Sequence, residues 1–399
     1  MNSDMSFAVS RNNGSLEWAG KNLNTIFAQR SNLLNPNMWR MIYEVVRFNE
    51  HANRIAEEAD AMPPNSHPFA KMSLGEFFKK FNYSKFFYEN YLLPMTAAIW
   101  SMPADKTFDE FPLVTLVQFM RNHHLLQVSN RPKWKTIPNG SKSYVEKIVA
   151  QLDDCRLKTK VVGVKRMPNK VNVICENGTV EEFDHVIFAT HTDQALEILG
   201  DDATPEETEI LGGVKFSQNK AYLHRDETLM PKNRTTWSSW NYLTEVQDEA
   251  KSTTMCLSYW MNNLQTFIDP EVFGNVIVTM NPTRLPDENK VLGSWNYTHP
   301  SYSSETIKSQ DELHKIQNKR RTLFAGAWTN YGFHEDGCTS GLLAAAQLGA
   351  KCPFEIVLNG GRPKYGVKKA DAKARNSFDI IPLLSITAIL VACIYAYTL

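Results

Sequence analysis

The sequence has no excess charge of either sign and little cysteine. Its 43 Lys and Arg residues balance 43 Asp and Glu residues. This balance argues against a nucleic-acid-binding protein, because such proteins normally carry a basic surface. Only six of the 399 residues are cysteine, and none form a C-x-x-C pair. With no H-x-x-x-H pattern either, we expect neither a disulfide framework nor a metal site, and a reducing, cytosolic setting suits the main domain.

Other familiar motifs are also missing. The sequence has no P-loop, no G-x-S-x-G motif and no G-x-G-x-x-G stretch, because Gly212-Gly213 and Gly360-Gly361 are isolated pairs. The N-terminal residues are polar and lack the apolar core of a signal peptide, so none is expected there.

One long stretch, residues 380–399, carries no charge. Its length is about the roughly 20 residues that a helix needs to span a bilayer core. The preceding segment is basic, with a single acid, Asp371, among Arg362, Lys364, Lys368, Lys369, Lys373 and Arg375. By the positive-inside tendency this flank stays cytosolic, so we expect a single-pass C-terminal membrane anchor with the main domain in the cytosol. The alternative is a buried core helix.

The chain changes its hydrophobic period along its length. Residues 6–20 predict a hairpin around an Asn-Asn-Gly turn, and helical spacing follows from Asn35-Pro36 to about residue 152. Ser73 and Glu76 predict a capping box within this helical part. Period-two patterns then predict strands at residues 157–183, with a tight turn at Asn177-Gly178, and several aromatic-rich strands follow a buried one at residues 184–190.

These patterns predict an α/β protein in which a nucleotide-binding domain is interleaved with an α+β substrate domain, plus a C-terminal transmembrane helix. The predicted substrate domain comprises residues 1–152, with the hairpin and helices, and residues 201–300, with an antiparallel aromatic-rich sheet. The predicted cofactor domain comprises strands in residues 153–200 and a last strand and helix in residues 301–352. A basic linker, residues 353–379, leads to the anchor, residues 380–399.

The stretch "FAGAWTNYGFHEDGCTSGLLAAAQLGA", residues 324–350, predicts a strand, a loop and a helix rich in small residues. Backbone N–H groups at such a helix start favour electron-rich partners, and Gly326 would leave room for a phosphate-bearing ligand. Gly337 and Gly341 would let the helix lie close to its neighbours. The alternative is tight strand–helix packing with acidic capping residues, and the residues alone do not decide between the two.

The same stretch resembles the C-terminal flavin motif of the FAD-dependent amine oxidase and phytoene desaturase-like superfamily. More narrowly, the chain resembles bacterial-type NAD/FAD-binding oxidoreductases from residue 3 to about residue 349. The resemblance rests on several further segments in family order: "DMSFAVS", "LEWAGKNLNTIFAQR", "NLLNPNMWRM", "YLLPMTAAIWS", "LLQVSNRPKWKTIPNGSKSYV", "FDHVIFATHTDQAL" and "YWMNNLQ".

This resemblance implies FAD as the cofactor, and it implies that the nucleotide-binding domain is an incomplete Rossmann-like FAD-binding domain. It places Val161 on the strand that meets the adenine, and Gly326 and Ala327 near the pyrophosphate. It places Glu335, Asp336 and Gly337 on the ribityl and pyrimidine side of the flavin. There the helix start would stabilise negative charge on the reduced ring.

Family members begin with a strand–G-x-G-x-x-G–helix unit, an acid for the ribose and an Arg-Gly-Gly stretch, none of which this sequence contains. We therefore expect that the sequence starts behind this unit and that the main pyrophosphate and ribose contacts are missing from it. The catalytic residues are not evident. His191 is a candidate to face the flavin, and His334 is a candidate acid or base. The alternative for His334 is a loop histidine whose ring is hydrogen-bonded within the protein and has no catalytic role.

The resemblance implies an FAD-dependent oxidoreductase that transfers hydride to the flavin from an apolar small molecule. The expected anchor would put the mouth of the substrate cavity near the bilayer, which favours a lipid or isoprenoid-like substrate. Amine oxidation is the alternative chemistry, and a membrane-anchored, non-catalytic binding protein is the alternative class. Five aromatic residues alternate on the predicted strands: Trp237, Trp240, Tyr242, Tyr259 and Trp260. Most of them are expected to belong to the hydrophobic core, and a minority to line an apolar substrate cavity.

Overall fold

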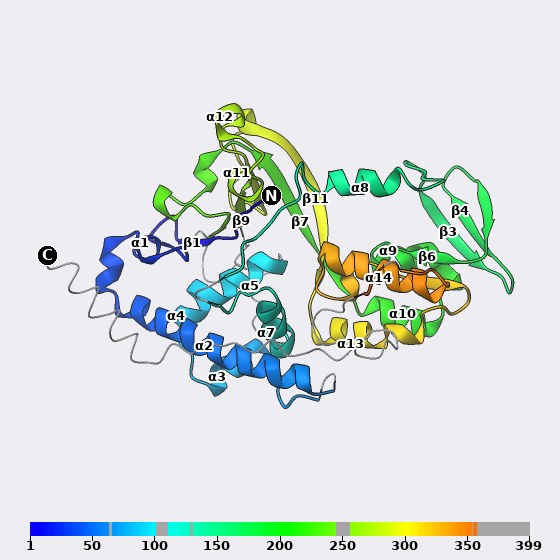
Figure 1. Ribbon diagram of the computed structural model, residues 1–399, viewed down its shortest axis with the longest axis horizontal. Helices are drawn as coiled ribbons and strands as arrows, with labels where there is room; N and C mark the ends of the chain where they lie inside the picture. The colour runs from blue at the N-terminus through cyan, green and yellow to red at the C-terminus, as the bar shows by residue number, and fades with distance from the viewer. Residues whose placement is uncertain (64–65, 101–110, 128–130, 245–255, 353, 357–399) are drawn as a thin grey trace. The chain divides into compact units, whose positions relative to one another are not determined.

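The computed structural model describes residues 1–63, 66–100, 111–127, 131–244, 256–352 and 354–356. All of them belong to one compact unit, Met1–Lys364 (Figure 1). Among these residues the helices are α1 (Leu23–Ile26), α2 (Pro36–Ala61), α3 (Leu74–Lys80), α4 (Lys85–Phe87), α5 (Leu93–Trp100), α7 (Leu113–Asn122), α8 (Lys142–Val149), α9 (Thr192–Leu199), α10 (Pro205–Gly212), α11 (Met261–Leu264), α12 (Pro270–Phe273), α13 (Ser304–Glu312) and α14 (His334–Gln347).

The strands are β1 (Phe7–Arg11), β2 (Leu16–Ala19), β3 (Val161–Arg166), β4 (Val171–Cys175), β5 (Val180–Phe183), β6 (Val186–Phe188), β7 (Lys215–His224), β8 (Trp240–Leu243), β9 (Cys256–Trp260), β10 (Ile277–Met280), β11 (Val291–Ser301) and β12 (Thr322–Phe324). Short helical turns are η1 (Arg30–Leu34), η2 (Tyr88–Leu92), η3 (Gly200–Asp202), η4 (Glu227–Leu229), η5 (Arg234–Thr236), η6 (Glu288–Lys290), η7 (Leu313–Lys315) and η8 (Ala327–Thr329). Of these turns, η2 is a π-helix.

Helix α2 is the longest helix described and begins where the sequence predicts it. The Asn35 side chain accepts a hydrogen bond from the backbone N–H of Asn37, and Pro36 occupies the first turn, where its missing N–H costs nothing. The predicted capping box between Ser73 and Glu76 also opens α3. These helices and α7 bury one aromatic-rich core, in which Phe48 has no exposed surface.

A seven-stranded sheet has the order β11-β7-β10-β9-β8-β1-β2 (Figure 1). The predicted hairpin of β1 and β2 forms one edge, and β1 pairs in parallel with β8, which lies more than 200 residues later in the sequence. Strands β7 and β11 pair over their whole length as an antiparallel ribbon. The sheet thus joins the N-terminal segment to the later strands, and this pairing is too distant in sequence for a local pattern to predict it.

Two strand predictions need correction, and one strand was not predicted. One of the expected aromatic-rich strands, residues 235–243, is extended only in β8, because the Asn233 side chain caps the turn η5 before it. The last buried strand, β12, ends at Phe324, since Gly326 adopts a positive φ and the turn η8 follows. Strand β11 was not predicted, because Gly293 and Pro300 weaken its strand pattern, and pairing with β7 nevertheless imposes the strand.

The remaining strands form two smaller sheets. The predicted antiparallel strands β3, β4 and β5 form a three-stranded sheet, while β6 and β12 form a two-stranded parallel sheet. The side-chain amide of Gln317 closes the outer edge of β12, because it bonds both the N–H (2.9 Å) and the carbonyl (2.6 Å) of Phe324. On β6, the N–H and carbonyl of Ile187 face the opposite edge, where the described residues supply no strand.

The mixed α/β architecture is as predicted. The boundaries between the cofactor and substrate domains stay a prediction. The predicted basic linker lies almost wholly, and the predicted transmembrane helix entirely, outside the described residues. Within the described part of the chain, no helix is both long and apolar enough to cross a membrane.

Candidate functional site

The candidate site lies where the parallel strands β6 and β12 end. Phe188 and Phe324, the last residues of the two strands, stack with ring centroids 5.6 Å apart. Beyond them, the Ala325 N–H donates to the carbonyl of Phe188 at 2.8 Å, and the Trp328 indole Nε1–H donates to the carbonyl of Thr190 at 3.2 Å. The segments that follow β6 and β12 therefore leave the sheet side by side, at the edge where ligands bind in parallel α/β sheets.

Gly326 follows β12 and is packed by its own neighbours. Its N–H donates to Ser340 Oγ at 2.9 Å, and its carbonyl accepts from Thr329 Oγ1 at 2.8 Å. Its φ of 150° favours glycine, and a Cβ there would lie 2.6 Å from Nε1 of Trp328. Packing alone therefore requires glycine at this position. Contact between Gly326 and a pyrophosphate stays a prediction, and its own N–H is not available for it.

Unpaired backbone donors begin one residue further on. The N–H groups of Ala327, His334 and Glu335 have no hydrogen-bond partner among the described residues. Gly337 faces Ala327, because a Cβ on Gly337 would lie 3.8 Å from the Ala327 nitrogen. Unpaired N–H groups at the start of α14 carry the partial positive charge of the helix dipole, which favours an electron-rich partner. The structure thus brings together five of the six predicted site residues, Gly326 to Gly337.

The two acids of this motif have different surroundings. Asp336 is buried and caps α14, since its carboxylate accepts hydrogen bonds from the Phe333 N–H and from Asn330 Nδ2, both at 2.9 Å. Glu335 is exposed in the first turn of the helix. Asp336 therefore holds the helix start in place, and Glu335 is the acid that is free to meet a ligand.

The sixth predicted residue, Val161, lies elsewhere. It begins β3 in the three-stranded sheet, opposite Cys175 of β4. The structure therefore does not place it in the corner formed by β12 and α14, and its contact with an adenine stays a prediction.

The candidate histidines are both anchored by side chains. His334 is the first residue of α14, and its Nδ1 lies 2.8 Å from the Tyr144 hydroxyl of α8. His191 precedes α9, lies 3.1 Å from Thr298 Oγ1 through its Nδ1, and stacks on Phe216. Each has a structural partner, so neither stands out as an acid or base.

Most of the predicted aromatic set belongs to the core, as expected. Tyr242 is buried in the main core, with Trp240 and Tyr259 packed against it. Trp237 is buried in a smaller cluster with Trp260 at its margin. The T-shaped pair of Trp240 and Tyr259 is only partly buried, as is Trp260, and contact of these rings with a substrate stays a prediction.

Sequence reasoning missed a second polar group, on the long strands β7 and β11. Asn219 is buried, and its Nδ2 lies 2.9 Å from Nδ1 of His299, while its Oδ1 accepts from Asn281 Nδ2 at 2.7 Å. The only sequence signal was polar residues on the inward face of a strand, and β11 itself was not predicted.

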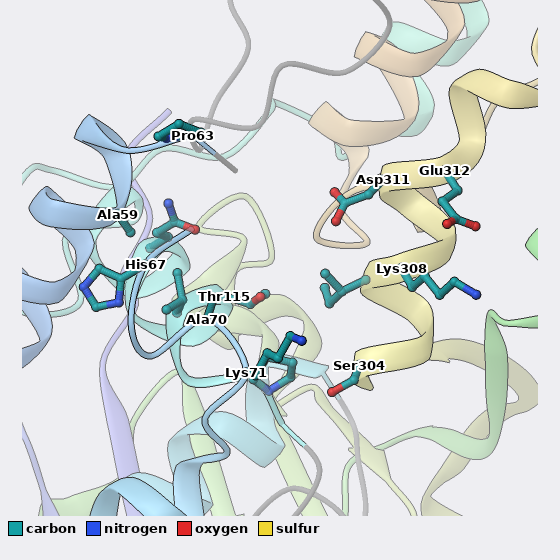
Figure 2. A pocket seen from close by; sticks show the side chains of 14 residues that line it. Ala59, Pro63, His67, Ala70, Lys71, Thr115, Ser304, Lys308, Asp311 and Glu312 are labelled. Atoms are coloured by element: carbon teal, nitrogen blue, oxygen red, sulfur yellow. The ribbon is translucent and has the colours of Figure 1, made fainter. Parts of the chain in front are cut away.

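A cavity of about 460 Å³ lies apart from the candidate site, between α13 and the segments around α2 and α7 (Figure 2). None of the six predicted residues line it. Its charged side chains have mixed signs, with Lys71 and Lys308 near Asp311 and Glu312. Lys308 also pairs with Glu209 at 2.9 Å outside the cavity, so the lining favours no single class of ligand. Among the described residues, no group of His, Cys, Asp and Glu could hold a metal ion.

Strand ends that meet a glycine-bearing helix start define a dinucleotide-type site in an α/β protein. The chain matches the flavin-containing amine oxidoreductase family over residues 13–349, and it belongs to that family. The resemblance seen in the sequence is therefore confirmed, and the cofactor of the family is a flavin, FAD. Comparison with curated protein sequences returns no match.

Solved structures share this fold at low sequence identity. A CLA-producing fatty acid isomerase from P. acnes aligns with a TM-score of 0.57 at 12% identity, over 88% of this chain and 80% of that chain. Wild-type putrescine oxidase bound to putrescine aligns with a TM-score of 0.55 at 12% identity, over 88% of this chain and 82% of that chain.

The residues of the corner fit a flavin in part. Ala327, Glu335 and Gly337 fit, since they offer free N–H groups, a free carboxylate and a position without a side chain. Gly326 and Asp336 do not offer free polar groups, because each is engaged within the chain.

Proposed function

We propose that the chain is an FAD-dependent oxidoreductase whose flavin lies against Ala327 and the start of α14. The unpaired N–H groups of Ala327, His334 and Glu335 are the observation that carries this proposal, because backbone donors at the start of a helix favour an electron-rich partner. Bound FAD supplies a hydride acceptor. The chain contributes the helix dipole at the ring edge, and its substrate sheet excludes water.

The proposed substrate is an apolar small molecule of a lipid or isoprenoid-like kind. Trp240 and Tyr259 support this, because their partly buried rings, 5.0 Å apart, offer an apolar border next to the main core. The fold is also that of a fatty acid isomerase. Amine oxidation is the alternative chemistry, and the same fold occurs in a putrescine oxidase. We further propose that residues 380–399 anchor the protein in a membrane, so that its substrate would be taken up near lipid.

A second candidate function is that of a non-catalytic binding protein. The open edge at Ile187 favours it, because the described parallel sheet has only two strands and therefore contacts a dinucleotide from few positions. Each charge-assisted hydrogen bond that is missing forfeits roughly 1.5–3 kcal/mol, or about one to two orders of magnitude in affinity. Weak or absent FAD binding would distinguish this candidate from the enzyme.

Two glycines of α14 provide a matched test. Gly337→Ala adds a methyl group 3.8 Å from the Ala327 nitrogen, which is ordinary contact within the protein but narrows the corner. Gly341→Ala adds one where nothing lies within 4 Å. We expect FAD, titrated by flavin fluorescence and by absorbance after desalting, to bind Gly337→Ala at least about tenfold more weakly than wild type, a loss of about 1.4 kcal/mol.

Gly341→Ala serves as the control, and both variants should keep the circular dichroism of the wild type. Equal affinity in both variants would refute the placement of the flavin at Gly337. No measurable FAD binding by wild type would favour the non-catalytic candidate. Gly326→Leu is not a useful variant, because Trp328 already occupies the space that the new side chain would need.

A further inference from the structure

Three polar side chains form a continuous hydrogen-bonded series across the long strands. Asn281, just after β10, contacts Asn219 of β7, and Asn219 contacts His299 of β11. Asn219 and His299 lie on the same face of the ribbon, since Ser217 and Asn219 pair with His299 and Tyr297. The direction of every hydrogen bond in this series can be derived from its two ends.

The derivation starts from the backbone. The Lys220 N–H can only donate, so the side-chain atom 2.8 Å away is the Asn281 oxygen Oδ1. Asn281 Nδ2 therefore points to Asn219, whose oxygen must accept at 2.7 Å. The Asn219 amide nitrogen then faces the Ser217 carbonyl at 3.2 Å, which requires a donor and fixes the same orientation independently.

The orientation of the Asn219 amide determines which ring nitrogen of His299 carries the proton. Its Nδ1 lies 2.9 Å from the donating Nδ2 of Asn219, so Nδ1 must be unprotonated. Burial, with the nearby His191 adding to it, holds the pKa of His299 below its ordinary value, so the neutral ring predominates at neutral pH. The single ring proton is therefore on Nε2, which has no partner among the described residues.

The backbone of His299 lies next to the candidate site. Its neighbour Thr298 bonds to His191, directly after β6, and its other neighbour Pro300 lies 3.5 Å from the position of a Cβ on Gly332, in the loop before α14. The backbone of β11 therefore crosses the end of the parallel sheet at this residue. Because side chains alternate along a strand, His299 points to the opposite face from Thr298, away from the loops that would hold the cofactor.

We propose that His299, fixed as its Nε2–H tautomer by Asn219 and Asn281, donates a hydrogen bond to an acceptor atom at the reaction site. This inference rests on the proposed flavin site. The acceptor belongs to the substrate, as a carboxylate, carbonyl or amine nitrogen, because the His299 side chain faces away from the loops that would hold the flavin. Asn219 and Asn281 are positioning residues, since they act only through the imidazole. An otherwise apolar substrate would thus be oriented by one polar end.

The tautomer can be measured without any flavin. In the full chain carrying ¹⁵N-labelled histidine, NMR should show an Nε2–H signal that is lost in His299→Gln, with Nδ1 as an unprotonated nitrogen. Asn219→Leu should convert this signal to a mixture of tautomers, because the donor that faces Nδ1 is gone. Asn289→Leu, at an exposed asparagine of a surface turn, is the control. A proton on Nδ1 in wild type, or an unchanged signal in Asn219→Leu, would overturn the proposal.

The role at the site is measured with FAD-loaded full chain and two probes, oleate and putrescine. His299→Gln should raise the Kd of the probe that binds by about tenfold and leave the flavin spectrum unchanged. A shifted flavin absorption band with unchanged probe affinity would place the acceptor on the flavin and overturn the proposal.

No change in either quantity refutes His299 as a donor. Wild type that takes up no FAD refutes the proposed function and with it this role, while the NMR experiment still decides whether the tautomer is fixed.

Discussion

His224 shows what complete burial does to a titratable residue in this protein. Its side chain has no exposed surface within the seven-stranded sheet. Its Nδ1 accepts from the Asp226 N–H at 3.0 Å, and its Nε2 lies 2.8 Å from Thr279 Oγ1. A second ring proton would point Nδ1–H at the Asp226 N–H, donor against donor. Burial lowers the pKa of His224 to about 4, although Asp226 opposes the shift.

This residue predicts a loss of stability in mild acid. The folded-state pKa lies below the unfolded value, so the neutral ring is favoured by folding. The contribution is fully present above about pH 6.5 and is lost as pH falls towards 4. The shift from 6.5 to about 4 corresponds to roughly 3 kcal/mol. Urea unfolding should therefore give a lower free energy of unfolding at pH 4.5 than at pH 7, and the His224 contribution is part of that difference.

His224→Gln is the comparison, because glutamine is polar at this site but does not titrate between these pH values. The variant should be less stable at pH 7 yet should lose less stability between pH 7 and pH 4.5 than wild type. If the two proteins have the same pH dependence, His224 does not stay neutral in the folded state.

At the scale of elements, a buried charge cluster joins the three-stranded sheet to the helical segment that follows α9. The Arg166 side chain, on β3, is fully buried and pairs with Asp202 of η3 at 2.6 Å and with Glu207 of α10 at 2.5 Å. Burial acts to raise the pKa of Glu207, but the hydrogen bonds from Arg166 and Thr204 outweigh it and hold that pKa below its usual range. Arg320 adds a second partner to Asp202.

Arg166→Met should therefore destabilise the protein strongly, because it leaves the buried Glu207 carboxylate without its cation. Removing one partner of a buried pair typically costs about 3–5 kcal/mol. Denaturant unfolding measures the loss. Arg156→Met is the matched control, since Arg156 pairs with Asp154 and Glu181 on the surface, and it should change stability little. A small effect of Arg166→Met would mean that the elements are held together without this cluster.

At the scale of the whole molecule, apolar surface gathers on elements that have few partners. Helix α8 buries none of its residues against the described chain, and Val145, Ile148 and Val149 on it are exposed. Ile187, at the open edge of the parallel sheet, is also exposed. Surface of this kind limits the solubility of a monomer.

The proposed anchor predicts how the protein fractionates. Full-length protein should sediment with membranes and resist carbonate extraction, because residues 380–399 carry no charge and follow a basic segment. A form ending at residue 379 should leave the membrane pellet. Detergent-free sedimentation with a carbonate wash makes the measurement, and size-exclusion chromatography separates aggregates from membrane-bound material. A deleted form that still resists carbonate extraction would refute the anchor.

The sequence alone determined the features that depend on neighbouring residues. The hairpin of β1 and β2, the cap of α2 at Asn35 and the start of α14 all follow from local turn and capping chemistry, which acts over a few residues. The composition and segment order also determined the mixed α/β class and the family, because motifs such as residues 324–350 are contiguous.

Only the tertiary structure decided which groups are free to act. Trp328 fills the space at Gly326 and Ser340 takes its N–H, contacts that depend on how α14 returns to β12. Strand β11 forms because β7 pairs with it, and that pairing brings Asn219 to His299 across 80 residues of sequence. Such contacts form only after the chain closes long loops, so no local pattern encodes them.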